Sequence, residues 1–436
     1  MKLRPFELAL VIIFIVMAIV SLVVLKSFKP ERSPEETEAA LIGSVQIWGT
    51  LPAESVEQVL LAVRKNNEGY NNVSYRYYHP DDFDTQLVNA LADGEGPDII
   101  LTSHEKLIEM RKRIQPISYD SYPLRDFKNL YVDGAEIFTL SDGIYAYPVA
   151  VDPLMLYWNR DIFATEGFLQ APATWESLVN TMFASLVQRD FDRTITRSAV
   201  AMGEYQNVRN AFGILSALLI QGGMQGVLEE GSNKYLVRLQ TSISGQGDPL
   251  RSAADFYTRF ARPSNTLYSW NRAFQDDRMK FVSEDLAMYF GYGSEGPQLE
   301  RINPNLNFDI AEIPQGETAT LRRTYGKFYG LSLLEKSDNT QGATIVMRAL
   351  STTENSEMIA VASGMVPARR SLVSQGSNDK YGRLTYKSTA VALGWLNPDR
   401  AEADKIFSTL TSDINENRRD LNAAVGDASR RLADVY

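Results

Sequence analysis

Residues 45–101 read VQIWGTLPAESVEQVLLAVRKNNEGYNNVSYRYYHPDDFDTQLVNALADGEGPDIIL, and the order of segments within this stretch sets the expected fold. Three short runs are β-prone, namely Val45–Trp48, Val73–Tyr77 and Asp98–Leu101. Between them, apolar residues recur at helical spacing, first around Val56 and Leu60 and then around Phe83 and Leu87. Alternating strands and helices indicate an α/β fold with a parallel sheet and right-handed crossovers.

The second of these helices has recognisable end signals. We expect Asp81 to cap its start and Gly94 to close it. Sheets of this kind place ligands beyond the carboxyl ends of their strands. The loops that follow Trp48 and Leu101 are therefore the first places to look for a binding site.

The rest of the chain continues in the same manner. We expect further strands at 154–158, 286–290, 308–313 and 328–333, and helices at 175–186, at 212–220 and from Lys380 onward. No tandem repeat of fixed period is visible.

The composition excludes several classes of protein. A chain of 436 residues is too long for one ordinary core and suits two lobes. A net charge of -10, with Lys and Arg scattered among carboxylates, argues against a nucleic-acid partner. There are no cysteines and two histidines, His79 and His104, which excludes Cys-based and His-rich metal sites. We expect no cofactor.

The first residues form a separate segment. Leu8 to Leu25 contains no charged residue and is close to the length that a helix needs to cross a bilayer. A cleaved signal peptide is the competing interpretation, but no small-x-small cleavage site follows the run. We expect residues 1–28 to be a cytoplasmic stub and a single-pass membrane anchor, and residues 29–43, which are rich in Pro and Glu, to be a linker.

Several motifs along the chain resemble one family. They are the stretch from His79 to Ile100 that ends in Gly96-Pro97-Asp98-Ile99-Ile100, the run Tyr145-Ala146-Tyr147-Pro148-Val149-Ala150-Val151-Asp152 followed by 156–161, the helix start Thr174-Trp175-Glu176, the pair Ala287-Met288, and residues 364–371. In this order they resemble the extracellular solute-binding proteins of the maltose-binding type, which are substrate-binding subunits of ABC importers.

The resemblance implies a two-lobed fold of the periplasmic-binding-protein type II class, with three crossovers acting as a hinge. Lobe one would comprise residues 44–148 and 329–372, and lobe two residues 149–328 and 373–436. A ligand would lie in the cleft between the lobes, which close over it. The implied partners are a small ligand, most simply a sugar or oligosaccharide, and ABC permease subunits. The lobes would stand on the extracytoplasmic side of the membrane.

The resemblance also nominates ligand-binding residues, because sugars are held by polar groups and by aromatic faces. They are Trp48, Thr50, Glu105, Lys106, Asp152, Phe212, Tyr292 and Trp395. Five of them have an alternative role. Trp48 and Phe212 could be core residues. Glu105 and Lys106 could belong to a solvated helix start, and Asp152 could stabilise the hinge by a local hydrogen bond.

One motif is a formal match only. The sequence Gly291-Tyr292-Gly293-Ser294-Glu295-Gly296 matches a dinucleotide fingerprint, but no βαβ unit begins there and Pro297 follows at once, so we interpret it as a loop.

Two other classes of function remain open, an enzyme and a binding module with another partner. A glycosidase needs only two carboxylates, which a chain with 54 acidic residues cannot fail to offer, and no nucleophile elbow or metalloprotease motif is present. We therefore expect a binding protein and not an enzyme. An anchored binding module for a sensor or an adhesion complex would use the same clamp.

Overall fold

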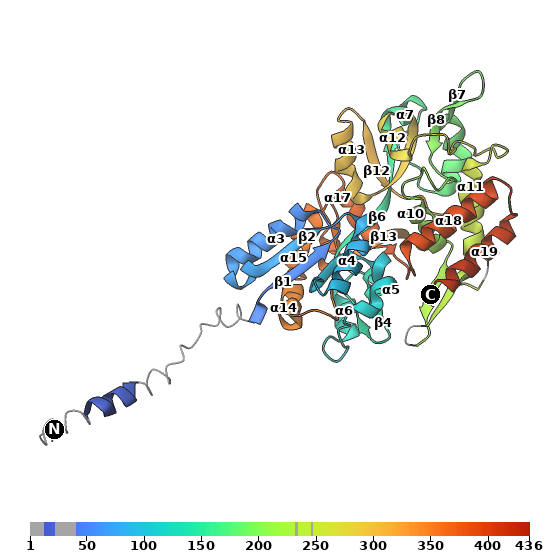
Figure 1. Cartoon of the computed structure of the whole chain (residues 1–436). Coiled ribbons are helices and arrows are strands. Elements are labelled where there is room, and N and C mark those ends of the chain that lie inside the picture. Colours follow the sequence, from blue (N-terminus) through green and yellow to red (C-terminus); the bar gives the residue numbers. More distant parts are fainter. Residues whose placement is uncertain (1–12, 22–40, 232–233, 246) are drawn as a thin grey trace, which may run out of the picture.

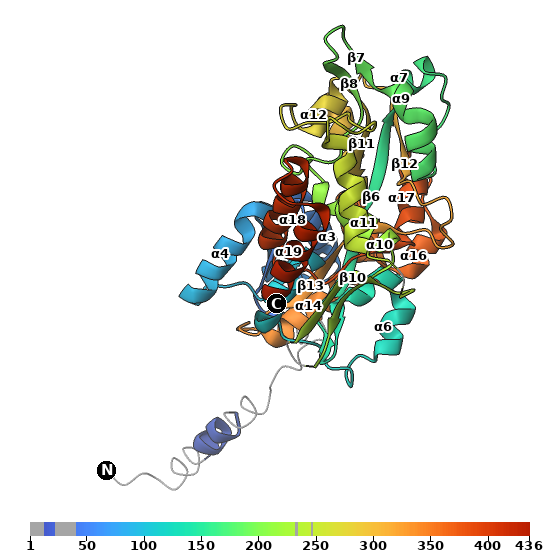
Figure 2. The same cartoon turned by 90° about the vertical axis from the view of Figure 1, so that its right-hand side faces the viewer.

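The computed structural model describes residues 13–21, 41–231, 234–245 and 247–436. Within them the chain forms a two-lobed α/β molecule (Figure 1). The N-terminal elements and the helices α14 (Thr340–Leu350) and α15 (Thr353–Ala362) lie at one end. The opposite end holds α7 (Arg160–Thr165), α12 (Asp277–Val282) and α13 (Gly296–Ile302) (Figures 1 and 2).

One large mixed sheet runs through both lobes. Its main path is β2-β1-β3-β13-β6-β11-β8-β7. These strands are β1 (Val45–Gly49), β2 (Val73–Tyr77), β3 (Ile99–Ser103), β6 (Tyr147–Asn159), β7 (Gln188–Arg189), β8 (Ile195–Val200), β11 (Leu286–Tyr292) and β13 (Thr324–Leu333). Off this path, β12 (Phe308–Glu312) and β14 (Val366–Pro367) pair with β6, and β15 (Ala392–Leu393) pairs with β13. The strands β1, β2 and β3 are parallel, as the opening stretch predicts.

The strand β6 passes from one lobe to the other. Its first part, Tyr147–Pro153, pairs with β13, and its second part, Leu154–Trp158, pairs with β11. The sequence suggested a crossing that ends near Asp152 and a separate strand from Leu154, and the structure joins the two into one continuous strand. Because Pro153 has no N–H to give to a sheet, it suits the point where the strand changes partners.

The buried apolar side chains fall into three clusters, of which two flank the sheet of lobe one and one large cluster fills lobe two. Along the chain, buried residues pass between the lobe-one clusters and the lobe-two cluster at three places. These lie between Val151 and Leu154, between Tyr325 and Phe328, and between Ala392 and Trp395. The third change comes later in the chain than the expected boundary at 372, because Tyr386 and Ala392 pack with the core of lobe one.

The remaining longer helices are α3 (Ala53–Asn66), α4 (Pro80–Asp93), α6 (Leu124–Leu130), α10 (Ala211–Gln221), α11 (Pro249–Thr258), α16 (Arg370–Gln375), α17 (Gly382–Thr389), α18 (Arg400–Asn415) and α19 (Leu421–Asp434). Shorter pieces are α5 (Leu107–Met110), α8 (Trp175–Ser177) and α9 (Phe183–Leu186). The prediction that Asp81 caps α4 is wrong: the cap is His79, whose Nδ1 accepts from the Asp81 N–H at 3.4 Å, because Pro80 takes the first helical position. Gly94 closes the helix in the left-handed region, as predicted.

Two antiparallel hairpins complete the molecule. One joins β4 (Thr139–Leu140) to β5 (Gly143–Ile144) in lobe one, and the other joins β9 (Met224–Glu229) to β10 (Tyr235–Ser242) in lobe two. The second hairpin reaches lobe one, because Glu229 accepts from the Ser141 N–H at 2.7 Å.

The expected membrane anchor lies mostly outside the described residues. Residues 13–21 of the apolar run are helical and exposed. Among the segments that the structure describes, no helix is both long enough and apolar enough to cross a membrane.

Candidate functional site

A cavity of about 390 Å³ opens where the carboxyl ends of β1 and β3 face the first turn of α18. One wall comes from lobe one and includes Thr50, Asp81, Asp84, Ser103, Glu105 and Lys106. Arg400, Ala401 and Asp404 of α18 form the opposite wall, and Lys327 and Tyr329 of β13 lie between the two walls. The cavity thus lies at the strand ends that the sequence singled out, and both lobes contribute to it.

Glu105 lies deep in this cavity, in a short helical turn (His104–Lys106) that directly follows β3. Its side chain is almost fully buried and accepts a hydrogen bond from the Tyr325 hydroxyl at 2.6 Å. Burial alone would raise the pKa of Glu105, but the positive charges of Arg400 and Lys327 lower it to about 2. The carboxylate is therefore ionised at neutral pH.

Arg400 is the first residue of α18, a helix that Asp399 caps by accepting from the Glu402 N–H at 3.0 Å. Its guanidinium lies 4.0 Å from the ring centre of Phe212 and 3.0 Å from an oxygen of Asp404. Its Nε is buried and has no hydrogen-bond partner among the described residues. The Glu105 and Asp404 carboxylates outweigh the effect of burial and raise the pKa of Arg400, so it stays charged.

Lys327 supplies the second cation, from the middle of β13. Its Nζ lies 4.3 Å from the ring centre of Tyr292. Within the described part of the chain, this ammonium makes no hydrogen bond and no ion pair. By contrast, Lys106 on the lobe-one wall is held by the carboxylates of Asp84 and Glu109.

The structure brings three of the nominated residues to the cavity, Thr50, Glu105 and Lys106. Trp48 is buried behind it, with Tyr78 at 4.7 Å between ring centres and Arg76 over its face. Phe212 and Tyr292 are also buried, and each has a cavity cation over its ring. These contacts match the core alternative for Trp48 and Phe212.

Asp152 lies in β6 beside the point where that strand changes partners. Its carboxylate accepts from the Ser294 N–H at 3.0 Å and from the Ser294 hydroxyl at 2.6 Å. Burial raises the pKa of Asp152 to about 6, against the effect of these hydrogen bonds. Because it ties β6 to the turn after β11, its contacts are those of the hinge-stabilising alternative.

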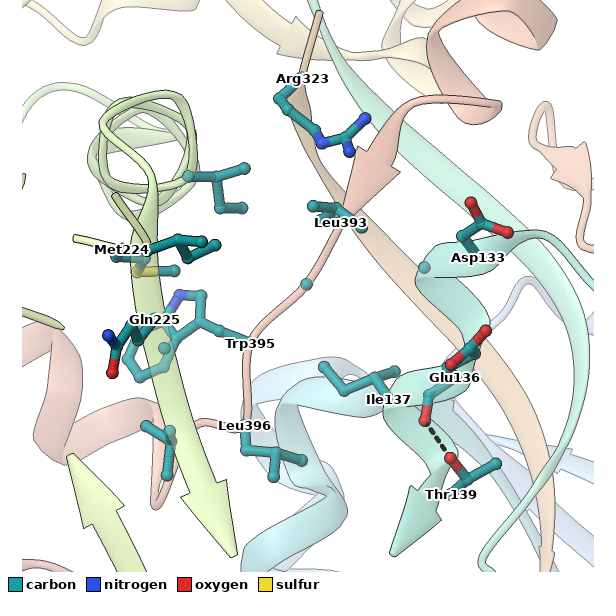
Figure 3. Close-up of a pocket in the computed structure, with 16 residues that line it drawn as sticks. Asp133, Glu136, Ile137, Thr139, Met224, Gln225, Arg323, Leu393, Trp395 and Leu396 are labelled. Carbon is teal, nitrogen blue, oxygen red and sulfur yellow. Dashed lines mark hydrogen bonds between the residues drawn. The ribbon is translucent and has the colours of Figure 1, made fainter. Parts of the chain in front are cut away.

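Trp395 belongs to a second cavity, of about 430 Å³, between the β9–β10 hairpin and the helical turn Asp133–Phe138. Figure 3 shows Trp395 and Gln225 on one side of it and Ile137, Glu136 and Thr139 on the other. The indole of Trp395 donates to the Ser216 hydroxyl at 3.0 Å and stacks on Phe212. It therefore packs into the core of lobe two.

Sequence reasoning missed Lys327, Arg400 and Asp404. Signals for them existed, since a lysine interrupts the apolar run of β13, and an arginine and an aspartate stand four residues apart after the capping signal Asp399. Among the described residues, no cluster of three His, Cys, Asp or Glu could hold a metal ion.

Comparison with known proteins agrees with this geometry. The bacterial extracellular solute-binding protein family matches residues 53–185. Proteins of Brucella abortus (strain 2308) and Brucella suis biovar 1 (strain 1330), both named as binding proteins, are 21% identical over 266 residues. Each of these matches spans 60% of this chain and 60% of the relative's length.

Solved structures share the fold over nearly the whole chain. A cyclo/maltodextrin-binding protein complexed with maltotetraose has a TM-score of 0.70 at 16% identity, covering 93% of this chain and 98% of that one. The sugar-binding protein MalE of Xanthomonas citri gives 0.70 at 17% identity, covering 90% and 97%. An ABC transporter solute-binding protein of Thermotoga lettingae, bound with α-D-tagatose, gives 0.67 at 17% identity, covering 90% and 99%.

All of these matches are binding proteins and none is an enzyme. The resemblance of this chain to the extracellular solute-binding proteins of the maltose-binding type is thus confirmed, by sequence over residues 53–185 and by fold over nearly its full length.

Proposed function

We propose that this chain is a membrane-tethered, extracytoplasmic solute-binding protein that captures a small sugar for an ABC importer. The observation that carries the proposal is the cavity of about 390 Å³ between the lobes, where Glu105 from one lobe faces Arg400 from the other. Few chain crossings join the lobes, so a small rotation can open and close this cavity without disturbing either core.

The chemistry of the cavity suits a hydroxyl-rich ligand. A sugar hydroxyl can donate to a carboxylate and accept from a cation, and this cavity offers both within reach of one small molecule. The similar structures that hold maltotetraose and tagatose support the same class of ligand. The nominated residues Thr50, Glu105 and Lys106 would contact the ligand directly.

The tether and the partner are part of the proposal. The uncharged run from Leu8 to Leu25 would hold the protein to the membrane, and residues 29–43 would give the lobes reach. Lobe one would comprise 44–148 and 329–372, and lobe two 149–328 and 373–436, except that residues 373–392 would join lobe one, because Tyr386 and Ala392 pack with its core. Permease subunits in the same membrane would receive the ligand.

A thermal-shift screen of the full chain in detergent tests the proposal. A ligand that binds only the native state stabilises it by RT ln(1 + [L]/Kd), about 2.7 kcal/mol at a ligand concentration of 100 Kd. We expect at least one sugar or polyol to raise the melting temperature by several degrees, and the same ligand to be recovered chemically unchanged. A panel in which only peptides or amino acids raised the melting temperature would contradict the sugar class. Conversion of a hit to product would contradict the binding-protein assignment.

A further inference from the structure

The aromatic rings near the cavity have their faces covered. The ammonium of Lys327 lies over Tyr292 at 4.3 Å, and the guanidinium of Arg400 lies over Phe212 at 4.0 Å. Of the aromatic residues that do line the cavity, Phe83 is fully buried, which leaves Tyr329 as the one partly exposed ring among the described lining residues. An oligosaccharide held by stacked aromatic faces needs a row of open rings, and this cavity offers no such row.

The same two cations have unused hydrogen-bonding capacity. The Nε of Arg400 is buried without a partner, and the ammonium of Lys327 makes no hydrogen bond or ion pair within the described part of the chain. Buried donors without partners are rare in native proteins because each one costs free energy. Both residues line the cavity, so a ligand that brings acceptor oxygens into it would give the ammonium of Lys327 a partner.

The charge of the cavity argues for a neutral ligand. Its lining carries four carboxylates, Asp81, Asp84, Glu105 and Asp404, and three cations, Lys106, Lys327 and Arg400. An anionic ligand would meet the ionised Glu105 at close range, and a cationic ligand would meet the ammonium of Lys327, which has no ion pair among the described residues. A molecule with hydroxyl groups can serve both signs of charge at once.

From these observations we infer that Lys327 and Arg400 are specificity-determining residues, which select a single neutral sugar ring or a polyol of that size and reject maltodextrin-type oligosaccharides. The inference rests on the proposed function and narrows it. The cations cover the rings on which a longer sugar would stack, and they offer donors to the hydroxyls of a compact one. The cavity volume, about 390 Å³, lies near the lower end of the range of about 300–1,000 Å³ for ligand pockets.

Isothermal titration of the full chain in detergent separates the possibilities. The panel consists of neutral hexoses and pentoses, myo-inositol and other polyols, the corresponding sugar acids, and maltotriose and maltotetraose. We expect a neutral single-ring sugar or a polyol to bind at least 100-fold more tightly than maltotetraose and than its own acid. An oligosaccharide or a sugar acid that binds most tightly would overturn this inference and leave the proposed function standing. No binding by any member of the panel would overturn both.

A substitution at Lys327 tests the assignment to residues. Lys327→Met keeps the aliphatic stem over Tyr292 and removes the ammonium, so we expect at least a 10-fold loss of affinity for the best single-ring ligand and a smaller preference over maltotetraose. Lys387→Met is the matched control, since Lys387 pairs with Glu312 outside the cavity and its loss is expected to leave the affinity unchanged. Lys327→Arg, which keeps the charge, is expected to retain more affinity than Lys327→Met. Equal affinity of wild type and Lys327→Met, with both folded by thermal melting, would refute the role of Lys327.

Discussion

Two arginines, one in each lobe, lie in very different surroundings: Arg111 is buried, whereas the side chain of Arg400 is 25% exposed. Arg111, in lobe one, is 4% exposed, and each of its three guanidinium nitrogens has a hydrogen-bond partner. It donates to the Tyr145 hydroxyl at 3.2 Å and to Asp142 at 3.0 Å. It also contacts the β9–β10 hairpin: it donates a hydrogen bond to the Tyr235 hydroxyl and forms an ion pair with Glu229 at 2.6 Å.

Arg400, in the wall of the cavity, has one carboxylate partner, Asp404, and a buried Nε without a partner in the described residues. A polar network that is fully satisfied rigidifies a structure, whereas a partly satisfied one costs free energy until something completes it. We conclude that the Arg111 network fastens the hairpin to lobe one. Under the proposed function, a ligand would complete the Arg400 network. Substitutions of Arg111 should therefore change stability, whereas loss of the Lys327 ammonium should chiefly change binding.

The largest effect is expected for Arg111→Met. Loss of the guanidinium leaves Glu229, which is almost buried, and two tyrosine hydroxyls without their partner. Breaking one side of a buried ion pair costs about 3–5 kcal/mol. We expect the free energy of unfolding from urea titration to fall by that amount. Arg111→Lys should recover less than half of it, because one ammonium cannot reproduce the planar fork.

A second prediction concerns Glu105 and acid. The folded-state pKa of Glu105 is about 2, below its ordinary value of 4.5, so ionised Glu105 adds stability above pH 4.5 that is lost as the pH falls toward 2. In the variant Glu105→Gln this contribution is absent. We expect the free energy of unfolding of wild type to exceed that of the variant by on the order of 3 kcal/mol at pH 7 and by little near pH 2. A difference that stays constant from pH 7 to pH 2 would show that the cations do not stabilise this carboxylate.

A smaller effect of opposite sign is expected for Asp152. The folded-state pKa of Asp152 is about 6, above its ordinary value of 3.8, because the folded protein favours the neutral carboxyl. Its contribution to the free energy of unfolding is therefore fully present below about pH 4 and is lost as the pH rises through 6. Asp152→Asn still accepts from the Ser294 N–H and does not titrate. Relative to wild type, the variant should gain on the order of 2 kcal/mol between pH 4 and pH 6, as measured by urea unfolding at each pH. If the free energies of unfolding of wild type and variant changed with pH in parallel, the raised pKa of a buried Asp152 carboxyl at the hinge would be contradicted.

The sequence predicted those parts of the molecule that depend on neighbouring residues. The parallel strands β1, β2 and β3 follow from short apolar runs and their spacing, and Thr50, Glu105 and Lys106 followed because ligands bind beyond such strand ends. The tyrosine partners of Glu105 and Arg111 could not be found in this way. Each network joins segments more than 100 residues apart, such as Tyr325 with Glu105 and Tyr235 with Arg111. No local pattern encodes such a meeting.

The covered rings were hidden for the same reason. Tyr292 and Phe212 were nominated because aromatic side chains bind sugars, and the structure places both outside the cavity lining, under the cations that line it. Whether a ring is open or covered depends on which cation folds over it, and Lys327 and Arg400 come from a strand and a helix far along the chain. A resemblance to a family can therefore nominate an aromatic residue without showing whether its ring is accessible to a ligand.

The smallest expected change in stability is the sharpest test of the contrast between the two networks. Lys327 has no ion pair or hydrogen bond within the described residues, so Lys327→Met breaks no contact of that kind and keeps the apolar stem. Lys327→Met loses the cation–π contact with Tyr292, worth about 0.5–2 kcal/mol, and part of the positive charge that lowers the pKa of Glu105. Removal of an unpaired charge from a partly buried site offsets these losses. We expect the free energy of unfolding without ligand to stay within about 1 kcal/mol of wild type. For Arg111→Met, by contrast, we expect a loss of about 3–5 kcal/mol. A loss as large as that of Arg111→Met would mean that Lys327 holds the two lobes together, and that the cavity cations belong to the architecture and not to ligand recognition.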